Sequence, residues 1–394
     1  MHILIFLDQN PASLGGVQAS VLLQKKYLEL AGHRVSVAAP RSKFKPTDGH
    51  ILYPSFPLTP GREYNATARL NQAYKYVVAE LAKLPEPVDV VHVQADWWGA
   101  LLGAGFAKRQ NLPLIHTLHT NLMIGATHVV GALGARFLIF LHSAIFKFWV
   151  ADRPHGDMGS AWFYLSQIAS RASTVIAPTG HFARLAREMG VASRIEVVPT
   201  GVDDVALDGL FKGESSAVPQ VSMAWSGRFS NEKRLLEFID ALALADLPAK
   251  VEIYGNGPLE KQAAAAIAKY SLQDRVSIRG RVSHDQMLKE LAAADILVQT
   301  SVGFETQGLT VYEAGVVGTP SVICDWNIAE DLPADSCWQV PVNTVEALAA
   351  TLKQAHTDVV SGNPKRIDLR GQLYQSALTQ RTVDIYLRAI AARR

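Results

Sequence analysis

Residues 296–324 read ILVQTSVGFETQGLTVYEAGVVGTPSVIC, and they place a helical segment between two short apolar runs. The runs are Ile296–Gln299 and Ser321–Cys324, and the helical segment starts at Gly308-Leu309. Apolar runs of this length are typical of buried strands, and strands that alternate with helices favour a parallel sheet covered by helices on both faces. The segment therefore predicts an α/β fold.

The same alternation continues through the chain in two series. The first opens with Ile3–Leu7 and a helix from Val17 to about Leu30, and its later strand candidates are Val35–Ala39, Val88–Val93, Leu114–Leu118, Thr174–Ala177 and Ile195–Val198. The second series, which includes residues 296–324, begins with Gln220–Trp225, Lys250–Tyr254 and Arg275–Ile278. Two series predict two Rossmann-like domains, and 394 residues exceed what one hydrophobic core usually serves.

The boundary between the domains is best placed after the segment that ends at Asp203. We therefore predict a first domain at 1–203 and a second at 204–371. The turn-rich stretch Gly213–Pro219 (GESSAVP) is typical of a linker. A last helix at about 372–394 is expected to pack back on the first domain.

Composition excludes some classes of function. The formal net charge is +2 and no region is densely basic, so the sequence does not favour nucleic-acid binding. Only two cysteines, Cys324 and Cys337, occur, which suits a reducing compartment. The apolar run before Asp8 is too short for the core of a signal peptide. We expect a cytoplasmic protein.

Residues Val129–Val150 (VVGALGARFLIFLHSAIFKFWV) are long enough to cross a bilayer. Arg136, His142 and Lys147 interrupt the run, and a charge near the centre of a membrane is costly. On a helix, Arg136, Ser143 and Lys147 fall within a narrow sector, which predicts a polar side and a broad apolar face. A buried helix, a helix lying on a membrane surface and a true span remain open.

Two glycine-containing turns are candidate phosphate sites. Gly15-Gly16 follow the first strand and open the first helix, where backbone amides and the helix dipole favour an anion. Gly227-Arg228 follow another strand, and Lys233 lies five residues after Arg228, so both cations can reach one diphosphate. A purely structural turn and a solvated loop are the alternative interpretations.

The strongest signal is the stretch that carries Glu305 and Glu313. Glu305 lies in the loop after Ile296–Gln299, and Glu313 lies about one turn inside the helix that follows. Such carboxylates can accept hydrogen bonds from sugar and ribose hydroxyls, while the amides at the start of the helix, in the segment Thr306-Gln307-Gly308-Leu309, face a diphosphate.

The stretch FETQGLTVYEAGVVGTPSVICD (304–325) resembles the donor signature E-x7-E of retaining glycosyltransferases, in particular family 4. Other segments match in register over most of the chain: Gly15-Gly16, HTLHTN (116–121), VVPTGVD (197–203), SGRFSNEK (226–233) and YGNGP (254–258). The resemblance implies the GT-B fold, in which an acceptor-binding and a donor-binding Rossmann-like domain face each other across a deep cleft. Asn256 and Gly303-Phe304 depart from the usual residues of the family.

The resemblance also implies roles for individual residues. Arg228 and Lys233 would hold the donor pyrophosphate, beside Gly227. Glu305 would meet the hydroxyls of the transferred sugar, and Glu313 would meet the ribose.

Three further positions take roles from the same resemblance. Gly16, next to Gly15, would pack its backbone against the phosphate, Val282 would lie near the base, and His119 would be the active-site histidine that contacts sugar or acceptor.

A metal site is disfavoured. His116 and His119 are three residues apart and point to opposite faces if both are in a strand, and no further cluster offers the remaining zinc ligands. The chain also contains no Asp-x-Asp. We expect no metal and no cofactor.

The sequence therefore predicts a retaining, metal-independent transfer of a hexose from a UDP- or GDP-linked sugar. The wording Glu305-Thr306-Gln307-Gly308 resembles enzymes that act on diacylglycerol or related glycolipids, and the apolar-basic segment 129–150 suits a lipid acceptor at the inner membrane surface. A soluble acceptor, a UDP-sugar epimerase on the same fold and a non-catalytic binding module are the alternatives. The oligomeric state stays open.

Overall fold

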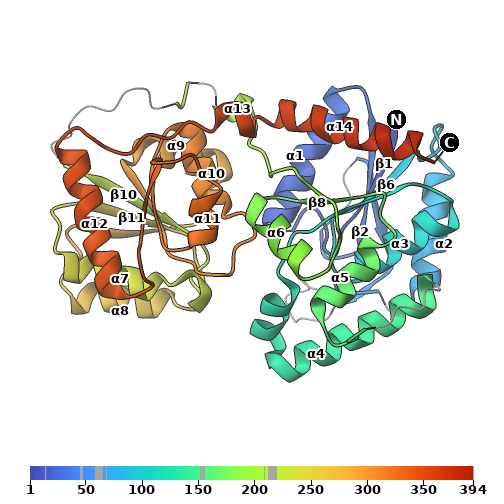
Figure 1. Ribbon diagram of the computed structural model, residues 1–394, viewed down its shortest axis with the longest axis horizontal. Coiled ribbons are helices and arrows are strands. Elements are labelled where there is room, and N and C mark those ends of the chain that lie inside the picture. The colour runs from blue at the N-terminus through green and yellow to red at the C-terminus, as the bar shows by residue number, and fades with distance from the viewer. Residues whose placement is uncertain are drawn as a thin grey trace. The chain divides into compact units, whose positions relative to one another are not determined.

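The computed structural model describes residues 1–13, 15–44, 48–57, 65–67, 69–150, 156–207, 209–211 and 220–393, with the side chains of 123–126 and 128–130 left out. The chain forms two compact units, one of Met1–Gly201 with Gln375–Arg394 and one of Val202–Tyr374 (Figure 1). The predicted linker Gly213–Pro219 lies outside the described residues. Where the chain passes between the units, Val202 forms a parallel bridge with Tyr374.

The N-terminal unit is built around a seven-stranded parallel sheet in the order β3-β2-β1-β6-β7-β8-β9. Its strands are β1 (His2–Phe6), β2 (Arg34–Pro40), β3 (His50–Tyr53), β6 (Val90–Val93), β7 (Leu114–Thr117), β8 (Thr174–Ala177) and β9 (Ile195–Val197), and β4 (Phe56–Pro57) pairs antiparallel with β5 (Asn65–Ala66) outside it. In the middle of the sheet Ile3 lies beside Val35 and Val90, and all three are buried. Helices on both faces of the sheet explain why most side chains of these strands are apolar.

Helices cover this sheet, and the C-terminal helix is one of them. They are α1 (Gly16–Leu30), α2 (Leu70–Leu81), α3 (Trp98–Arg109), α4 (Leu122–Val150), α5 (Ala161–Ala169), α6 (Gly180–Glu188) and α14 (Gln375–Ala391). Figure 1 shows α14 running along the N-terminal unit beside α1. The buried Tyr386 on α14 hydrogen-bonds His92 on β6, with 2.7 Å between the hydroxyl oxygen and Nδ1.

The C-terminal unit contains a six-stranded parallel sheet in the order β12-β11-β10-β13-β14-β15. Its strands are β10 (Ser222–Ser226), β11 (Lys250–Tyr254), β12 (Val276–Gly280), β13 (Ile296–Gln299), β14 (Ser321–Ile323) and β15 (Cys337–Gln339). Its helices are the short η1 (Val205–Leu207) and η2 (Asn231–Lys233) and the longer α7 (Leu235–Ala245), α8 (Glu260–Lys269), α9 (His284–Ala293), α10 (Leu309–Val317), α11 (Trp326–Glu330), α12 (Val345–Val360) and α13 (Arg370–Leu373). The predicted alternation of strands and helices is confirmed in both units.

Two strands of these sheets were not predicted. β3 (His50–Tyr53) and β15 (Cys337–Gln339) are four and three residues long, and each lies at an edge of its sheet. Apolar runs this short give a weak periodic pattern, so neither strand stood out in the sequence.

Helix α4 differs from its predicted pattern. Gly131 has non-helical torsion angles (φ 74°, ψ 166°) and kinks the helix. From there to Val150, the buried side chains follow one stripe: Ala135, Ile139, His142, Ser143, Phe146 and Val150. The predicted polar sector of Arg136, Ser143 and Lys147 is therefore wrong, because Ser143 is buried while the other two are exposed.

The exposed side of α4 carries large apolar side chains. Leu133 is 86% exposed, Phe137 64% and Phe148 84%, with Phe140 and Leu141 between them. These five residues, which we call the exposed stripe of α4, recur at spacings of three, four and seven and share one side of the helix. Among the described helices, Gly131–Val150 alone has the length and apolar composition of a membrane span, a criterion that a buried core helix also meets.

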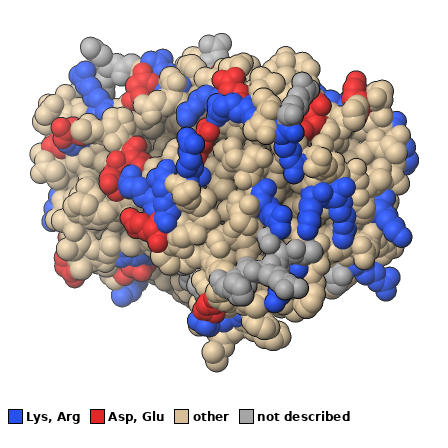
Figure 2. All heavy atoms as spheres, turned by 45° about the vertical axis from the view of Figure 1, so that its right-hand side comes forward, with Lys and Arg blue, Asp and Glu red and all other residues tan. Residues whose placement is uncertain are grey.

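Charged side chains are unevenly spread over the surface. On the face shown in Figure 2, Lys and Arg side chains lie side by side on the right-hand side with no Asp or Glu between them. On the left-hand side both signs are mixed. Since the net charge of the chain is only +2, this is a local excess of positive charge.

Candidate functional site

The strand order of the C-terminal unit locates its candidate site. β10 is the first strand of the unit, and its neighbours β11 and β13 continue the sheet in opposite directions. In such sheets ligands bind at this switch point, outside the carboxyl ends of the strands. The segments that leave β10 and β13 there, residues 227–234 and 300–308, contain Arg228, Lys233 and Glu305.

Close backbone packing shapes the loop after β10. The amide of Phe229 donates to the carbonyl of Asn256 (2.9 Å), and that of Gly227 donates to the carbonyl of Tyr254 (3.1 Å). Gly255 has a φ of +128°, and a Cβ on it would lie 1.9 Å from the carbonyl oxygen of Gly227. The glycine-rich segment after Tyr254 is therefore needed to support the loop that carries Arg228.

Lys233 and Glu305 form an ion pair between Nζ and Oε1. Their side chains are only 23% and 15% exposed, so the pair is largely shielded from water. The Ser301 hydroxyl donates to the same Oε1 (2.9 Å), and the Lys233 Nζ lies 5.5 Å from the centre of the Phe304 ring. The structure thus brings together a cation and a carboxylate that lie 72 residues apart in the chain.

The loops after β10 and β13 are also joined below this ion pair. The Thr300 hydroxyl donates to the carbonyl of Lys233 (2.6 Å) and accepts from the indole N–H of Trp225 (2.9 Å). Trp225 and Thr300 are both buried, which fixes the two loops relative to each other.

Helix α10 starts at the same edge of the sheet. Its N-cap, Gly308, has a φ of +75°, a conformation that favours glycine, and as a glycine it brings no side chain to cap the first turn. Leu309 is the first helical residue, and Thr306 and Gln307 lie in the loop before it. Glu313 lies at the fifth position of the helix, as predicted.

A residue that was not predicted contacts Glu313. His284, the first residue of α9, hydrogen-bonds the Glu313 Oε1 through Nε2 at 2.8 Å. This hydrogen bond to the carboxylate raises the pKa of His284 above its ordinary value. Val282 lies two residues before it, partly buried against the core. The only sign of a role for His284 in the sequence is its position directly after Val282-Ser283. The sequence does not indicate that His284 contacts Glu313.

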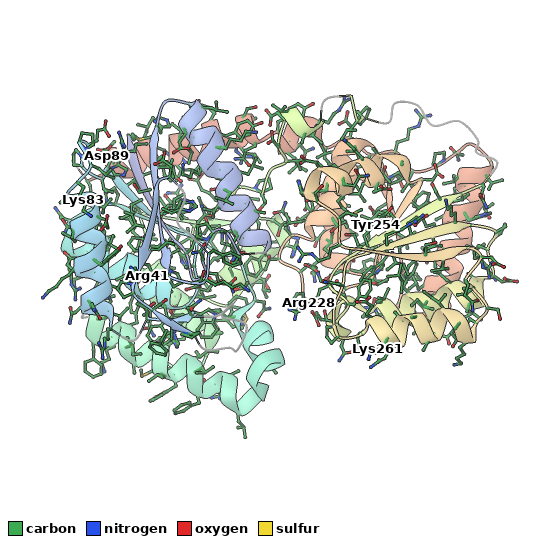
Figure 3. All side chains as sticks on the ribbon, turned by 180° about the vertical axis from the view of Figure 1, so that it is seen from behind. Arg41, Lys83, Asp89, Arg228, Tyr254 and Lys261 are labelled. Atoms are coloured by element: carbon green, nitrogen blue, oxygen red, sulfur yellow. The ribbon has the colours of Figure 1, made fainter. Side chains whose placement is uncertain are left out.

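Arg228 does not join the ion pair of Lys233. Its side chain is exposed, and among the described residues no ion pair involves it. Figure 3 labels Arg228 together with Tyr254 and Lys261 of the same unit. The predicted convergence of Arg228 and Lys233 on one diphosphate stays a prediction.

The N-terminal unit places His119 just after β7. Its Nε2 lies 3.0 Å from the side-chain Oε1 of Gln94. The side-chain Nε2 of Gln94 donates to Oε1 of Gln24 on α1 (2.8 Å). The amide oxygen can only accept, so it holds the proton of His119 on Nε2. Burial lowers the pKa of His119 to about 4, so the ring is neutral at pH 7.

His116 belongs to strand β7 and is completely buried, whereas His119 follows the end of the strand. Within the described ranges, no three His, Cys, Asp or Glu side chains gather as metal ligands do.

Two carboxylates, the half-buried Asp8 and the buried Asp96, lie at the switch point of the N-terminal sheet, between β1 and β6. Asp8 accepts hydrogen bonds from the amides of Asp96 (2.7 Å), Trp97 (2.9 Å) and Gly99 (2.8 Å), at the start of α3. Burial raises the pKa of Asp96 to about 7, although the Thr120 hydroxyl donates to its carboxylate. The amino end of α3 is therefore occupied by Asp8, a role that the sequence did not reveal.

Gly15 and Gly16 lie at the start of α1, as predicted. Both are exposed, and Gly15 serves as the N-cap without a side-chain hydrogen bond. Their predicted contact with a phosphate stays a prediction.

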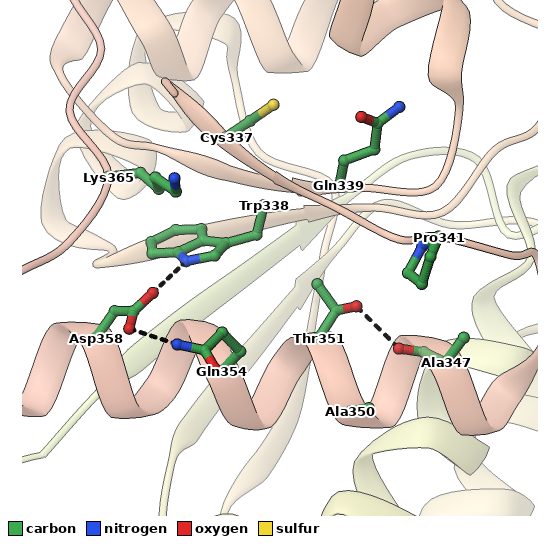
Figure 4. A pocket seen from close by; sticks show the side chains of 10 residues that line it. All are labelled: Cys337, Trp338, Gln339, Pro341, Ala347, Ala350, Thr351, Gln354, Asp358 and Lys365. Atoms are coloured by element: carbon green, nitrogen blue, oxygen red, sulfur yellow. Dashed lines mark hydrogen bonds between the residues drawn. The ribbon is translucent and has the colours of Figure 1, made fainter. Parts of the chain in front are cut away.

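A shallow cavity of about 470 Å³ lies elsewhere on the C-terminal unit, beside the edge strand β15 and helix α12 (Figure 4). The indole N–H of Trp338 donates to Asp358 (2.7 Å), which also accepts from Gln354 (2.7 Å). Because the polar groups of this cavity bond one another and the switch point is three strands away, it is not the candidate site.

Comparison with protein families gives a match to each half of the chain. Residues 14–205 match the model described as Glycosyltransferase Family 4, and residues 214–371 match the model described as Glycosyl transferases group 1. The chain belongs to glycosyltransferase family 4. It is an enzyme of that class, as predicted, which removes the epimerase and the non-catalytic binding module as alternatives.

Curated members of this family are similar over most of the chain. An alpha-monoglucosyldiacylglycerol synthase of Streptococcus pneumoniae is 25% identical over 340 residues, which covers 82% of this chain and 70% of that protein. The enzyme of the same name from Acholeplasma laidlawii is 24% identical and covers 82% and 80%. A 2-deoxystreptamine glucosyltransferase of Streptomyces kanamyceticus is 28% identical and covers 64% of each chain.

Solved structures of other proteins share the fold of this family 4 glycosyltransferase. Sucrose-phosphate synthase from Thermosynechococcus elongatus superposes with a TM-score of 0.71 at 20% identity, over 99% of both chains. Anabaena HepE in complex with UDP and glucose superposes with a TM-score of 0.68 at 16% identity, over 97% of this chain and 98% of that one. The predicted GT-B fold with two Rossmann-like domains is confirmed.

Proposed function

We propose that this glycosyltransferase moves a hexose, glucose or mannose, from a UDP- or GDP-linked donor to a membrane lipid with retention of anomeric configuration and without a metal. The observation that carries the proposal is the group at the C-terminal switch point. Lys233 and Glu305 meet there, α10 starts after the glycine N-cap Gly308, and Glu313 follows one turn later. The acceptor is a glycolipid precursor of the diacylglycerol or phosphoinositol type.

The positively charged groups of this site bind the donor pyrophosphate. Arg228 and Lys233 bind it together with Gly227 and the amides at the start of α10, and they stabilise the charge that develops as the nucleoside diphosphate leaves. Lys233 pairs with Glu305 in the structure. A bound pyrophosphate attracts the Lys233 ammonium group and weakens its ion pair with Glu305. The carboxylate can then accept hydrogen bonds from sugar hydroxyls.

Glu313 accepts the ribose hydroxyls, Val282 lies against the base, and Gly16 brings its backbone to the phosphate. The transferred sugar becomes oxocarbenium-like as its bond to the phosphate breaks. The acceptor hydroxyl attacks from the same face, and its proton passes to the departing phosphate oxygen. Neutral His119, oriented by Gln94, contacts the sugar or the acceptor through a hydrogen bond.

A membrane acceptor is supported by helix α4. Its exposed stripe of Leu133, Phe137, Phe140, Leu141 and Phe148 is an apolar surface that water solvates poorly. Gly105 on α3 allows α4 to pack closely, because a Cβ at that position would lie 1.9 Å from Nε1 of Trp149 on α4. A firmly held apolar stripe flanked by Arg136 and Lys147 suits the cytoplasmic face of an anionic membrane.

The names of two relatives add to this support, since both are alpha-monoglucosyldiacylglycerol synthases. A soluble acceptor is the second candidate. It is favoured by the 28% identity to a 2-deoxystreptamine glucosyltransferase, over a smaller share of the chain.

The first experiment is a transfer assay with UDP-glucose and GDP-mannose, each offered vesicles of diacylglycerol or phosphatidylinositol, or soluble 2-deoxystreptamine. We expect one sugar nucleotide and one vesicle to give product, with an α-anomeric proton in the NMR spectrum and equal rates with and without EDTA. Product from 2-deoxystreptamine alone would contradict the lipid acceptor, a β-linked product would contradict retention, and EDTA inhibition would contradict metal independence.

The second experiment tests the exposed stripe of α4 by sedimentation with anionic vesicles at low salt. Phe137→Ser with Phe148→Ser is expected to lower the bound fraction at least about tenfold, since burying each ring is worth about 1.5–3 kcal/mol. Leu30→Ser with Leu387→Ser, at two other exposed positions of the same unit, is the matched control and should bind like the wild type. Equal binding of the stripe variant and the control contradicts membrane docking through α4.

A further inference from the structure

The carboxylate that our proposal assigns to the ribose already has a partner within the protein, His284. The His284 Nε2 lies 2.8 Å from Oε1 of Glu313, across two packed helices, α9 and α10. The His284 side chain is 50% exposed and that of Glu313 is 15% exposed. The imidazole can therefore swing into solvent, whereas the carboxylate is confined.

We propose that His284 competes with the donor nucleotide for Glu313, so that binding of the ribose displaces the imidazole and makes donor affinity depend on pH. This inference rests on the proposed function, because it takes Glu313 as the ribose ligand. It assigns to His284 a role in setting donor affinity.

The geometry of the groups requires an exchange. A ribose presents two neighbouring hydroxyls, and a carboxylate that accepts from both uses both of its oxygens. His284 occupies Oε1, and only 15% of the Glu313 side chain is exposed, which leaves little open surface for two further donors beside the imidazole. We therefore expect a bidentate contact with the ribose to displace His284.

The charges around His284 decide its protonation. Glu313 faces it from α10, Asp285 lies beside it on α9, and Asp203 lies before η1, which packs against α9. β10, the other element packed there, has the sequence SMAWS and no ionisable side chain. Three carboxylates favour the imidazolium, and the bond to Glu313 is the main cause of the raised pKa of His284.

The sign of the pH dependence follows from this arrangement. The free protein holds the His284 proton more tightly than the complex, in which the bond to Glu313 is lost. Protons therefore oppose donor binding, and donor affinity falls as the pH drops through the raised pKa of His284.

The test is to titrate UDP-glucose and GDP-mannose into the protein from about pH 5.5 to about pH 8.5 by calorimetry, where the pyrophosphate diester itself does not titrate. For the nucleotide that binds, the affinity of the wild type is expected to fall as the pH is lowered, by at most about tenfold per pH unit. Binding should release a proton. His284→Ala and His284→Gln should each bind with affinity that changes less than about twofold over the range, and His284→Ala more tightly than wild type at the acidic end.

Two further variants sharpen the test. Asp285→Asn removes a neighbouring negative charge and should move the midpoint of the wild-type curve to lower pH. His356→Ala removes another partly exposed histidine of the same unit, on α12, and should behave as wild type.

A His284→Ala protein that keeps the wild-type pH dependence overturns this inference, as does one that binds more weakly by one constant factor at every pH. In either case, unchanged transfer by the wild type leaves the proposed function standing. A wild type that binds neither sugar nucleotide and transfers no sugar overturns the proposed function, and this inference with it.

Discussion

Removal of the Lys233 charge is expected to affect stability and turnover by different amounts. In Lys233→Met, Glu305 keeps only the Ser301 hydroxyl as a partner for its paired oxygen. Breaking a fully buried ion pair costs about 3–5 kcal/mol, and with side chains 23% and 15% exposed we expect about 1–3 kcal/mol. Turnover should fall about 100- to 1000-fold, because a preorganised positive group at the leaving pyrophosphate is lost.

The double variant Lys233→Met with Glu305→Gln separates the two effects. No unpaired charge is left, so the free energy of unfolding should return to within about 1 kcal/mol of wild type. Transfer should not return, since both groups that meet the donor are changed. Urea denaturation measures the first quantity and the transfer assay the second, with Lys261→Met, an exposed lysine of the same unit labelled in Figure 3, as the control.

The reasoning is refuted if Lys233→Met unfolds at the wild-type urea concentration and keeps more than about a tenth of wild-type kcat/KM. It is equally refuted if the double variant transfers sugar faster than Lys233→Met alone. The first result means that the ion pair neither stabilises the protein nor contacts the donor, and the second means that the loss of Glu305 does not impair transfer.

Three further expectations concern single positions. Gly255→Ala should lower Tm clearly, because the new Cβ would meet a carbonyl oxygen at 1.9 Å, whereas Gly371→Ala, with no atom within 4 Å, should leave Tm unchanged. Asp96 has its pKa raised to about 7, so between about pH 4 and 7 the folded protein keeps a proton that the unfolded chain has lost; wild-type stability falls across that interval, and Asp96→Asn should gain stability over wild type by at most about 1.4 kcal/mol per pH unit in urea denaturation. Tyr386→Phe should cost about 1–3 kcal/mol by the same method, because it leaves Nδ1 of buried His92 without its hydroxyl partner.

The sequence predicted the central strands and two of the four edge strands, Ile195–Val198 and Arg275–Ile278. Thr174–Ala177, Lys250–Tyr254 and Ile296–Gln299 agree with the structure residue for residue, because helices on both faces of a parallel sheet favour mainly apolar strands. The other two edge strands, His50–Tyr53 and Cys337–Gln339, are four and three residues long and were missed. The periodicity of α4 was visible, but which side of it faces the core depends on α3 and α5, and the sequence does not show that packing.

The candidate site shows the same division. The loop position of Glu305 and the helical position of Glu313 follow from local patterns, and both are confirmed. Their partners could not be predicted. Lys233 lies 72 residues from Glu305, and His284 lies 29 residues from Glu313, so each contact arises only when the sheet brings separate loops to one edge.

The two sheets share one strand order around their switch points, so α3 and α10 are counterparts, each following the strand that reverses the order. At the start of α3 the Asp8 carboxylate accepts hydrogen bonds from three backbone amides. The N-cap of α10 is Gly308, which has no side chain that could accept from the amides of that helix. The two units therefore differ at equivalent helix starts, because one start carries a carboxylate of the chain itself and the other begins with a glycine. With three of its first amides bound to Asp8, α3 cannot offer them to a phosphate, so an anion that binds the N-terminal unit has to use another element.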